Sequence, residues 1–262
     1  MNERQVMKLL EGVRAGRLRL DQALERLRTL PYEDLGFARL DTHRDLRRGF
    51  PEIVYGEGKS EEQIVKIARR LHRQGSLVLI SRLGPVILKR LRRRLRGLKD
   101  LAPARLALLG SAPRPLPGTD VLVIAAGTAD LPVAEEAAVV ASLMGCVVDR
   151  LTDVGVAGVH RLLGELPRLR RARVVVVVAG MEGALPSLVA GLVDRPVIGV
   201  PTSIGYGTGL KGVAALMSML NSCATGLLVV NIDNGLGAGY SAGVIARDTK
   251  QKNKKKRLTR NP

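Results

Sequence analysis

The stretch from Val174 to Thr202 restricts the fold most, because it reads as a strand, a helix and a second strand in succession. It opens with five consecutive valines and no polar alternation, which is typical of a strand buried on both faces of a parallel sheet. Apolar residues at helical spacing follow over 183–193, where Pro186 would lie in the first turn and its missing N–H would cost nothing. A second apolar strand over 197–200 completes one predicted βαβ unit.

Strands and helices alternate in the same way over most of the carboxyl-terminal half. The predicted strands cover 121–126, 146–149, 174–179, 197–200 and 227–232, and the predicted helices cover 131–144, 157–166, 183–193, 210–220 and 236–246. Such alternation favours an α/β fold with a doubly wound parallel sheet, and we prefer flavodoxin-like strand order for it.

The residues before this region predict a smaller α/β domain. Two short amphipathic helices are expected in 1–30 and an irregular segment in 31–50, and Ser60 with Gln63 fits a capping box for a helix through Arg73. The proline-rich segment SAPRPLPG at 111–118 is the best linker in the chain. We therefore expect three parts: a basic amino-terminal α/β domain (1–115), a second α/β domain (116–248) and a Lys-rich disordered tail (249–262).

The net charge of +18 is distributed unevenly. Residues 1–118 carry 26 basic and 13 acidic side chains, residues 119–248 carry 9 and 11, and residues 249–262 carry 7 basic and no acidic ones. This charge suits anionic ligands, nucleic acid or an Arg-rich solvated surface, and the solvated surface is our default interpretation. With no Trp, two Phe and four Tyr, the chain supplies few rings for base stacking, so a nucleic-acid partner is disfavoured.

Cysteine content and hydropathy bear on the compartment. Two cysteines, no signal-like amino terminus and no long uncharged apolar span favour the reducing cytoplasm and argue against a membrane protein.

Two strand ends resemble each other and mark the expected site. The segments 126–132 (AGTADLP) and 179–186 (AGMEGALP) each place Ala-Gly and a short polar turn before Leu-Pro, which opens a helix. Side by side, two such turns would form a pocket with paired helix N-termini, suited to a phosphate or a carboxylate. The simpler alternative makes Asp130 an N-cap and nothing more. The candidate binding residues are Gly127, Thr128, Asp130, Gly180, Met181, Gly183, Pro201 and Thr202.

Three side chains are candidates for chemistry. Glu182 lies in the second turn, where it is either a carboxylate favoured by the helix dipole or a working acid or base. His160 lies on a predicted helix, where the simpler interpretation is a polar surface residue. Cys223 lies in the polar segment NSCATG between a helix and a strand, where a loop thiol can be reactive, whereas Cys146 reads as a core thiol.

The segment from Gly207 to Gly212 matches the dinucleotide fingerprint GxGxxG. However, 201–206 separates the strand from these glycines, whereas the fingerprint needs the turn immediately after the strand. We expect a mobile glycine-rich loop over the pocket instead. The sequence holds no Walker motif and no CxxC pair.

Several long segments closely resemble the LarB family, the nickel-pincer nucleotide biosynthesis carboxylase/hydrolases. They are GFPEIVYGEGKSEEQI, AAGTADLPVAEEAAVVASLMG, DVGVAGVHRLL, VAGMEGALPSLVAGLVDRPVIGVPTSIGYG, MLNSCATG and VVNIDNGLGAGY, and the resemblance covers about residues 36 to 247. The second domain alone is similar to the PurE-type aminoimidazole ribonucleotide carboxylases and mutases. Thr128-Ala129 replaces the serines of that family's first turn, and Cys223 lies where PurE proteins use no cysteine nucleophile, so both departures weaken a purine substrate.

The resemblance implies that the chain carboxylates C5 of the pyridinium ring of nicotinic acid adenine dinucleotide with CO2 and hydrolyses the phosphoanhydride. The products would be pyridinium-3,5-biscarboxylic acid mononucleotide and AMP. It assigns the ring-adding thiolate to Cys223, and we expect Glu182 to remove the C5 proton and His160 to serve as a weaker acid/base or positioning candidate. Mg2+ is expected to assist the hydrolysis, although the sequence shows no dedicated metal cage.

Strand polarity separates these groups within one subunit. Glu182 and Asp130 follow strands and therefore lie at the carboxyl edge of the predicted sheet, whereas Cys223 precedes a strand and lies at the opposite edge. Either its loop folds back or Cys223 enters the site of a neighbouring subunit. The resemblance to PurE-type assemblies favours a homo-oligomer, an octamer, and small residues at 214–215 and 238–242 suit close subunit packing. The alternatives are a purine carboxylase or mutase and a basic nucleic-acid-binding protein, whose binding would collapse with salt.

Overall fold

The computed structural model describes residues 3–28, 32–42 and 44–258. The chain divides into two compact units between Ala112 and Pro113, within the predicted linker.

The second unit holds a five-stranded parallel sheet with strand order β11-β10-β9-β7-β8. Its strands are β7 (Asp120–Ala125), β8 (Val147–Thr152), β9 (Val174–Ala179), β10 (Val197–Pro201) and β11 (Leu227–Val229). Numbered along the chain within this sheet, the order is 2-1-3-4-5, so the predicted doubly wound fold and flavodoxin-like order are confirmed. The valine run forms the central strand β9, whose six residues are all buried.

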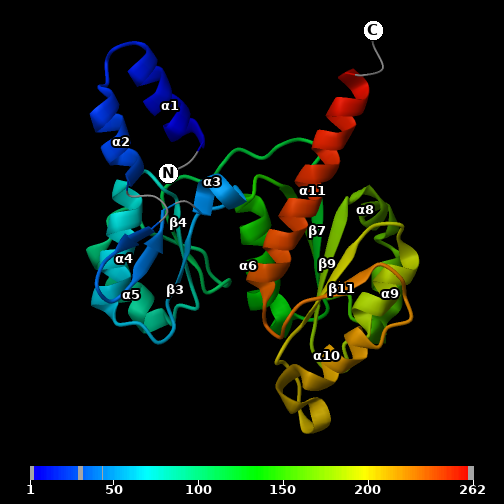
Figure 1. Ribbon diagram of the computed structural model, residues 1–262. Helices are drawn as coiled ribbons and strands as arrows, with labels where there is room; N and C mark the ends of the chain where they lie inside the picture. Colours follow the sequence, from blue (N-terminus) through cyan, green and yellow to red (C-terminus); the bar gives the residue numbers. More distant parts are fainter. Residues whose placement is uncertain (1–2, 29–31, 43, 259–262) are drawn as a thin grey trace. The chain divides into compact units, whose positions relative to one another are not determined.

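Helices cover both faces of this sheet. In Figure 1, α6 (Leu131–Leu143) and α11 (Gly235–Leu258) lie together on one face, and α8 (Leu166–Arg171) and α9 (Leu185–Leu192) lie on the other. The helix α10 (Val213–Leu220) packs against β10 and β11, and the short α7 (Val159–Leu163) follows β8. The sheet is therefore buried between two helical layers, as its apolar strands require.

Small residues bring α11 close to α6 within the chain. A side chain at Gly239 would collide with the carbonyl oxygen of Ala137, and Ala238 and Ala242 are completely buried. Ala215 is also completely buried. Ala215, Ala238 and Ala242 are therefore not available for the expected packing between subunits, whereas Ala214, Tyr240 and Ser241 are half-buried and leave that expectation a prediction.

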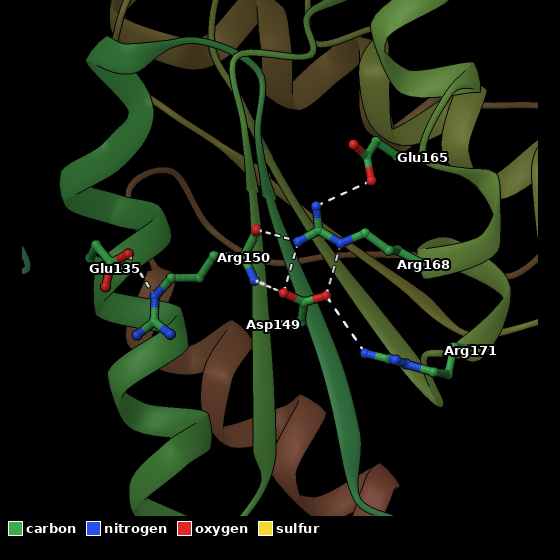
Figure 2. Close-up of polar contacts among 6 residues, drawn as sticks. All are labelled: Glu135, Asp149, Arg150, Glu165, Arg168 and Arg171. Atoms are coloured by element: carbon green, nitrogen blue, oxygen red, sulfur yellow. Dashed lines mark hydrogen bonds and ion pairs between the residues drawn. The ribbon is translucent and has the colours of Figure 1, made fainter.

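A polar cluster holds α6 and α8 to the edge strand β8 (Figure 2). Arg168 donates two hydrogen bonds to Asp149, of 2.9 and 2.8 Å, and a third to the carbonyl of Arg150. Arg150 in turn pairs with Glu135 of α6 at 2.8 Å. The guanidinium of Arg168 lowers the pKa of Asp149. Charges on an edge strand hinder pairing with another chain, so the cluster also protects this side of the sheet.

The first unit contains a four-stranded sheet with order β3-β4-β6-β5, in which β3 and β4 are parallel and the other neighbours antiparallel. Its strands are β3 (Ile53–Tyr55), β4 (Val78–Ser81), β5 (Lys99–Asp100) and β6 (Ala107–Leu109). Its helices are α1 (Glu3–Arg14), α2 (Leu20–Arg28), α3 (Arg44–Arg48), α4 (Glu61–Arg73) and α5 (Pro85–Arg94). The capping box of Ser60 and Gln63 is present, so that prediction is confirmed.

Two segments differ from expectation. The stretch predicted to be irregular forms the hairpin of β1 (Tyr32–Asp34) and β2 (Arg39–Asp41), whose three-residue strands are too short for a periodicity. The predicted disordered tail continues α11 as a helix to Leu258, because Lys, Arg and Gln extend an existing helix at little cost. Side chains beyond Asp248 and residues 259–262 lie outside the described part. No helix among the described residues is long and apolar enough to cross a membrane.

Candidate active site at the carboxyl edge of the sheet

The two glycine turns lie next to each other in the structure. They follow β7 and β9, which pair in parallel, and the Ala126 N–H donates to the carbonyl of Val178 at 2.9 Å where the strands end. The chain reverses its winding direction between these two strands, so the turns lie at the topological switch point of the sheet. Ligands of doubly wound proteins bind at this position, outside the carboxyl ends of the strands.

Asp130 connects the strand ends beneath the turns. Its side chain is buried, with 5% exposed. Oδ1 accepts a hydrogen bond from the Thr202 hydroxyl at 2.7 Å, and Oδ2 accepts one from the Gly127 N–H at 3.0 Å. The Gly180 N–H also hydrogen-bonds this carboxylate. One side chain therefore joins segments that follow β7, β9 and β10.

The environment of Asp130 disfavours its charge overall. Burial raises the pKa of Asp130, and the hydrogen bonds from Thr202, Gly127 and Gly180 oppose that effect. The charge of Asp233, which follows β11, adds to the increase. Both carboxylate oxygens of Asp130 accept hydrogen bonds from within the protein, so Asp130 holds the turns in place and is more than a simple N-cap. Its partner Thr202 is also buried.

The predicted glycines allow close backbone approach. A side chain at Gly180 would collide with the carbonyl oxygen of Ile204 and would lie 2.7 Å from Thr202 Oγ1. Gly183 has a φ of +65°, and a Cβ there would lie 2.8 Å from the carbonyl oxygen of Ala215. Any side chain at either position would push these segments apart.

The predicted site residues divide into a buried set and an exposed set. Gly180, Gly183, Pro201 and Thr202 are buried like Asp130, whereas Thr128, Met181 and Glu182 are exposed and Gly127 is half-buried. The exposed residues project from the two turns at the edge where a ligand would enter. The buried residues fix the shape of this edge, and the exposed ones supply its chemical groups.

The glycine-rich loop is anchored at this edge on both sides. The Met181 N–H donates to the Ile204 carbonyl at 3.0 Å, and a Cβ at Gly212 would lie 2.7 Å from the Thr202 carbonyl oxygen. Between these points Tyr206 is 82% exposed, and Leu210 and Lys211 have φ values of 44° and 52°. Two successive left-handed residues that are not glycine are strained. This backbone does not form the tight turn of a dinucleotide fingerprint.

Asp233 belongs to the site and was not among the predicted residues. It follows β11, its Oδ1 accepts a hydrogen bond from the Ser203 N–H at 2.8 Å, and its own N–H donates to the Pro201 carbonyl at 2.9 Å. The sequence signal that could have identified Asp233 is its position directly after the predicted apolar strand 227–232. Strand order was needed to bring it beside the end of β10.

The two remaining candidates, His160 and Cys223, lie at opposite edges of the sheet. His160 is exposed on α7, which follows β8 at the same edge, and its neighbour Arg161 pairs with Asp153 at 2.7 Å. Cys223 is exposed between α10 and β11. Just after it, the Gly226 carbonyl accepts a hydrogen bond from the N–H of Val197, the first residue of β10. Cys223 therefore lies at the amino edge, opposite Glu182, and its loop does not fold back.

A protein-only metal cage is not found in the described part of the chain. No group of three or more His, Cys, Asp or Glu side chains there could hold a metal ion. Asp130, the buried carboxylate at the edge, already uses both oxygens within the protein. Mg2+ commonly binds through one or two carboxylates together with substrate phosphates, so its part in the hydrolysis stays an expectation of the family resemblance.

Replacing Asp130 with asparagine should destabilise the second unit. The amide oxygen can still accept one hydrogen bond, but the amide NH2 then faces the other donor, either the Gly127 N–H or the Thr202 hydroxyl. Leaving a buried donor unsatisfied costs about 1–3 kcal/mol. Thermal unfolding should show the loss as a lower Tm. The matched control is Asp153→Asn, since the exposed Asp153–Arg161 pair is worth only about 0–1 kcal/mol. Equal Tm values for the two variants would contradict the connecting role of Asp130.

The fold and this edge define the class of the protein. It is a doubly wound α/β protein of flavodoxin-like order with two glycine turns at its switch point, and such proteins bind small ligands there.

Comparison with known proteins gives the family. Residues 32–110 match the LarB/PurE-like N-terminal domain, and residues 120–261 match the AIR carboxylase domain. The chain therefore belongs to the LarB/PurE-like family of the PurE-type carboxylase and mutase superfamily, and the sequence resemblance is confirmed. Both domains are those of carboxylase-type enzymes.

Two relatives come from Methanocaldococcus jannaschii. The uncharacterized protein MJ0165 is 38% identical over 250 residues, which cover 91% of this chain and 96% of the relative. An N5-carboxyaminoimidazole ribonucleotide mutase is 30% identical over 129 residues, which cover 48% and 75%. The crystal structure of a single-residue variant of Treponema denticola PurE2 shares 17% identity with a TM-score of 0.39, covering 57% of this chain and 97% of that one.

Proposed function

We propose that this chain is a pyridinium-3,5-biscarboxylic acid mononucleotide synthase. Its substrates would be nicotinic acid adenine dinucleotide and CO2, and it would also hydrolyse the phosphoanhydride to release AMP. The observation that carries the proposal is an exposed thiol, Cys223, in an AIR carboxylase domain joined to a LarB/PurE-like N-terminal domain. An electron-poor ring needs a nucleophile of this kind before it can attack CO2.

The thiol supplies the step that the ring cannot make unaided. The Cys223 thiolate adds to a ring carbon beside C5, and the positive charge of the pyridinium is lost. The resulting enamine-like ring attacks CO2 through C5 and forms the new C–C bond. A base then removes the C5 proton, and the thiolate leaves as the ring becomes aromatic again. Every atom balances without an oxidant or reductant.

The edge residues supply the remaining roles. Glu182 is exposed in the second turn and is our candidate for the base. Asp130 already accepts from the N–H groups of Gly127 and Gly180, so phosphate, ribose or carboxylate groups would contact the exposed residues of the two turns, such as Thr128 and Met181. His160, exposed near the same edge, is a candidate for acid/base work or positioning.

Cys223 and Glu182 must come from different subunits in this proposal. They lie at opposite edges of the sheet, and the five residues of β10 alone span roughly 17 Å. Within six residues of Cys223 along the chain, the apolar residues Met217, Leu220 and Leu228 are each about half exposed, which suits burial against another subunit. We therefore propose a homo-oligomer with shared active sites, an octamer by its PurE-type resemblance.

Product analysis tests the reaction. The protein is incubated with nicotinic acid adenine dinucleotide and carbon-13 bicarbonate, with and without Mg2+, and the products are followed by mass spectrometry. We expect AMP and a mononucleotide that has gained one labelled carboxylate. A wild-type reaction with neither product would overturn the proposal.

A purine carboxylase or mutase is the second candidate, because one relative in this superfamily bears the name N5-carboxyaminoimidazole ribonucleotide mutase. Against it stand the exposed Cys223 thiol and the Thr128-Ala129 pair in the first turn. Parallel incubations with N5-carboxyaminoimidazole ribonucleotide, and with aminoimidazole ribonucleotide and bicarbonate, separate the two, since a purine mutase would convert the first and a purine carboxylase the second.

A further inference from the structure

The amino-terminal unit has a carboxyl edge of its own. The parallel strands β3 and β4 end there at Tyr55 and Ser81, and the antiparallel strand β6 begins there at Ala107. Arg82 directly follows β4, and Arg105 lies two residues before β6. The Leu83 N–H donates to the Arg105 carbonyl at 3.1 Å, which ties the two arginine segments together.

Tyr55 is surrounded by charged side chains at this edge. Its side chain is half exposed, and its hydroxyl donates to Glu57 at 2.7 Å. The Lys59 ammonium lies 5.8 Å from the centroid of the ring. The hydrogen bond to Glu57 raises the pKa of Tyr55, and the charges of Arg82 and Arg105 oppose it. Tyr55 pairs with Ser81 in the sheet, which places Arg82 and the attached Arg105 segment beside the end of its strand. Three cations and one carboxylate therefore meet around one exposed ring.

The backbone of this cluster is unusual. Arg82 and Arg105 both adopt left-handed conformations, with φ values of 56° and 55°. Such conformations are costly for residues other than glycine, and they persist where the surrounding structure imposes them. Gly58 also has a positive φ, and a Cβ there would meet no atom within 4 Å, so the loop is open on that side.

The backbone N–H groups at the start of α4 do not contribute to anion binding at this cluster. The Ser60 hydroxyl already accepts from the Gln63 N–H, and the Gln63 side chain accepts from the Ser60 N–H, so α4 caps its own terminus. The cationic side chains are the groups that would meet an anion. Arginine presents paired N–H donors that match phosphate oxygens, and an exposed ring offers a stacking surface to a base.

We propose that Tyr55, Lys59, Arg82 and Arg105 form a nucleotide-binding site in the amino-terminal unit, in which the cations hold phosphate and the ring stacks on the base. Nothing in this site depends on carboxylation or on Cys223. A nucleoside monophosphate is the smallest ligand that carries both groups, so AMP is the appropriate probe.

Calorimetric titration of the full chain with AMP tests the site. The double variant Lys59→Met, Arg105→Gln should bind AMP at least about tenfold more weakly than wild type, because two phosphate contacts are lost. The matched control is Lys89→Met, Arg92→Gln, which removes two exposed cations from α5 and should leave binding unchanged. Tyr55→Leu should weaken AMP more than inorganic pyrophosphate, which has no base to stack.

Three results would overturn the site: no AMP binding by wild type, wild-type affinity in the double variant, or equal losses in the double variant and the α5 control. Equal losses would indicate that AMP is attracted by the overall positive charge of the amino-terminal unit and not by this cluster. Circular dichroism checks the fold, and if Arg105→Gln does not fold, Lys59→Met alone carries the test with an expected loss of several fold. AMP is also a product of the proposed reaction, so the titration is fitted to two sites, and the double variant should lose the amino-terminal site while keeping any site at the carboxyl edge of the second unit.

Discussion

The Cys223→Ala variant should lose carboxylation almost completely, by a factor on the order of 10³ or more, because removing a nucleophile removes the step on which the others depend. Without thiolate addition the ring keeps its positive charge, and C5 cannot attack CO2. Labelled product is measured by mass spectrometry. Intact-protein spectra of the wild type should also show the substrate ring attached to the protein, and the variant should show no such adduct.

Cys146→Ala provides a matched control with the same chemical change. Cys146 is buried in the core, and burial raises the pKa of its thiol, so it stays neutral and inaccessible near neutral pH. Its removal should leave the rate unchanged while costing some stability through the lost packing. Carboxylation at the wild-type rate in Cys223→Ala would remove the covalent mechanism, and loss of activity in both variants would indicate damage to the fold.

Sheet order in the second unit could be predicted because its signals are long. Five apolar strands alternate with helices, and parallel strands joined by right-handed crossovers leave few possible orders. The amino-terminal unit offered no such signal, since β5 has two residues and β1, β2, β3 and β6 have three each. Strands of that length are set by their partners rather than by their own pattern.

The adjacency of the two glycine turns at the carboxyl edge could be predicted, but which of their residues are buried and which are exposed could not. Repeated Ala-Gly turns marked the edge, and strand polarity alone placed Cys223 at the opposite one. The burial of Asp130 depends on Thr202, which lies 72 residues further along the chain. The left-handed conformations of Leu210 and Lys211 are likewise not predicted by any local propensity.

Mixing two inactive variants should restore activity if the active site is shared. Cys223→Ala subunits keep Glu182, and Glu182→Gln subunits keep the thiol, so a site at their junction can receive both groups. When equal amounts are dissociated, mixed and reassembled, random assembly should give about a quarter of the sites both wild-type residues. Labelled product should therefore appear at up to roughly that fraction of the wild-type rate, whereas each variant reassembled alone should stay inactive.

The reverse mixture supplies the control. Wild-type subunits reassembled with an equal amount of the double variant Cys223→Ala, Glu182→Gln should also keep about a quarter of the activity if sites are shared, and about half if each subunit is complete. Native mass spectrometry verifies that mixed oligomers have formed. Inactivity of the first mixture together with half activity of the second would place Cys223 and Glu182 in one subunit. That outcome would require the loop at 221–226 to cross from the amino edge of the sheet to the carboxyl edge, against the hydrogen bond that now ties Gly226 to the start of β10.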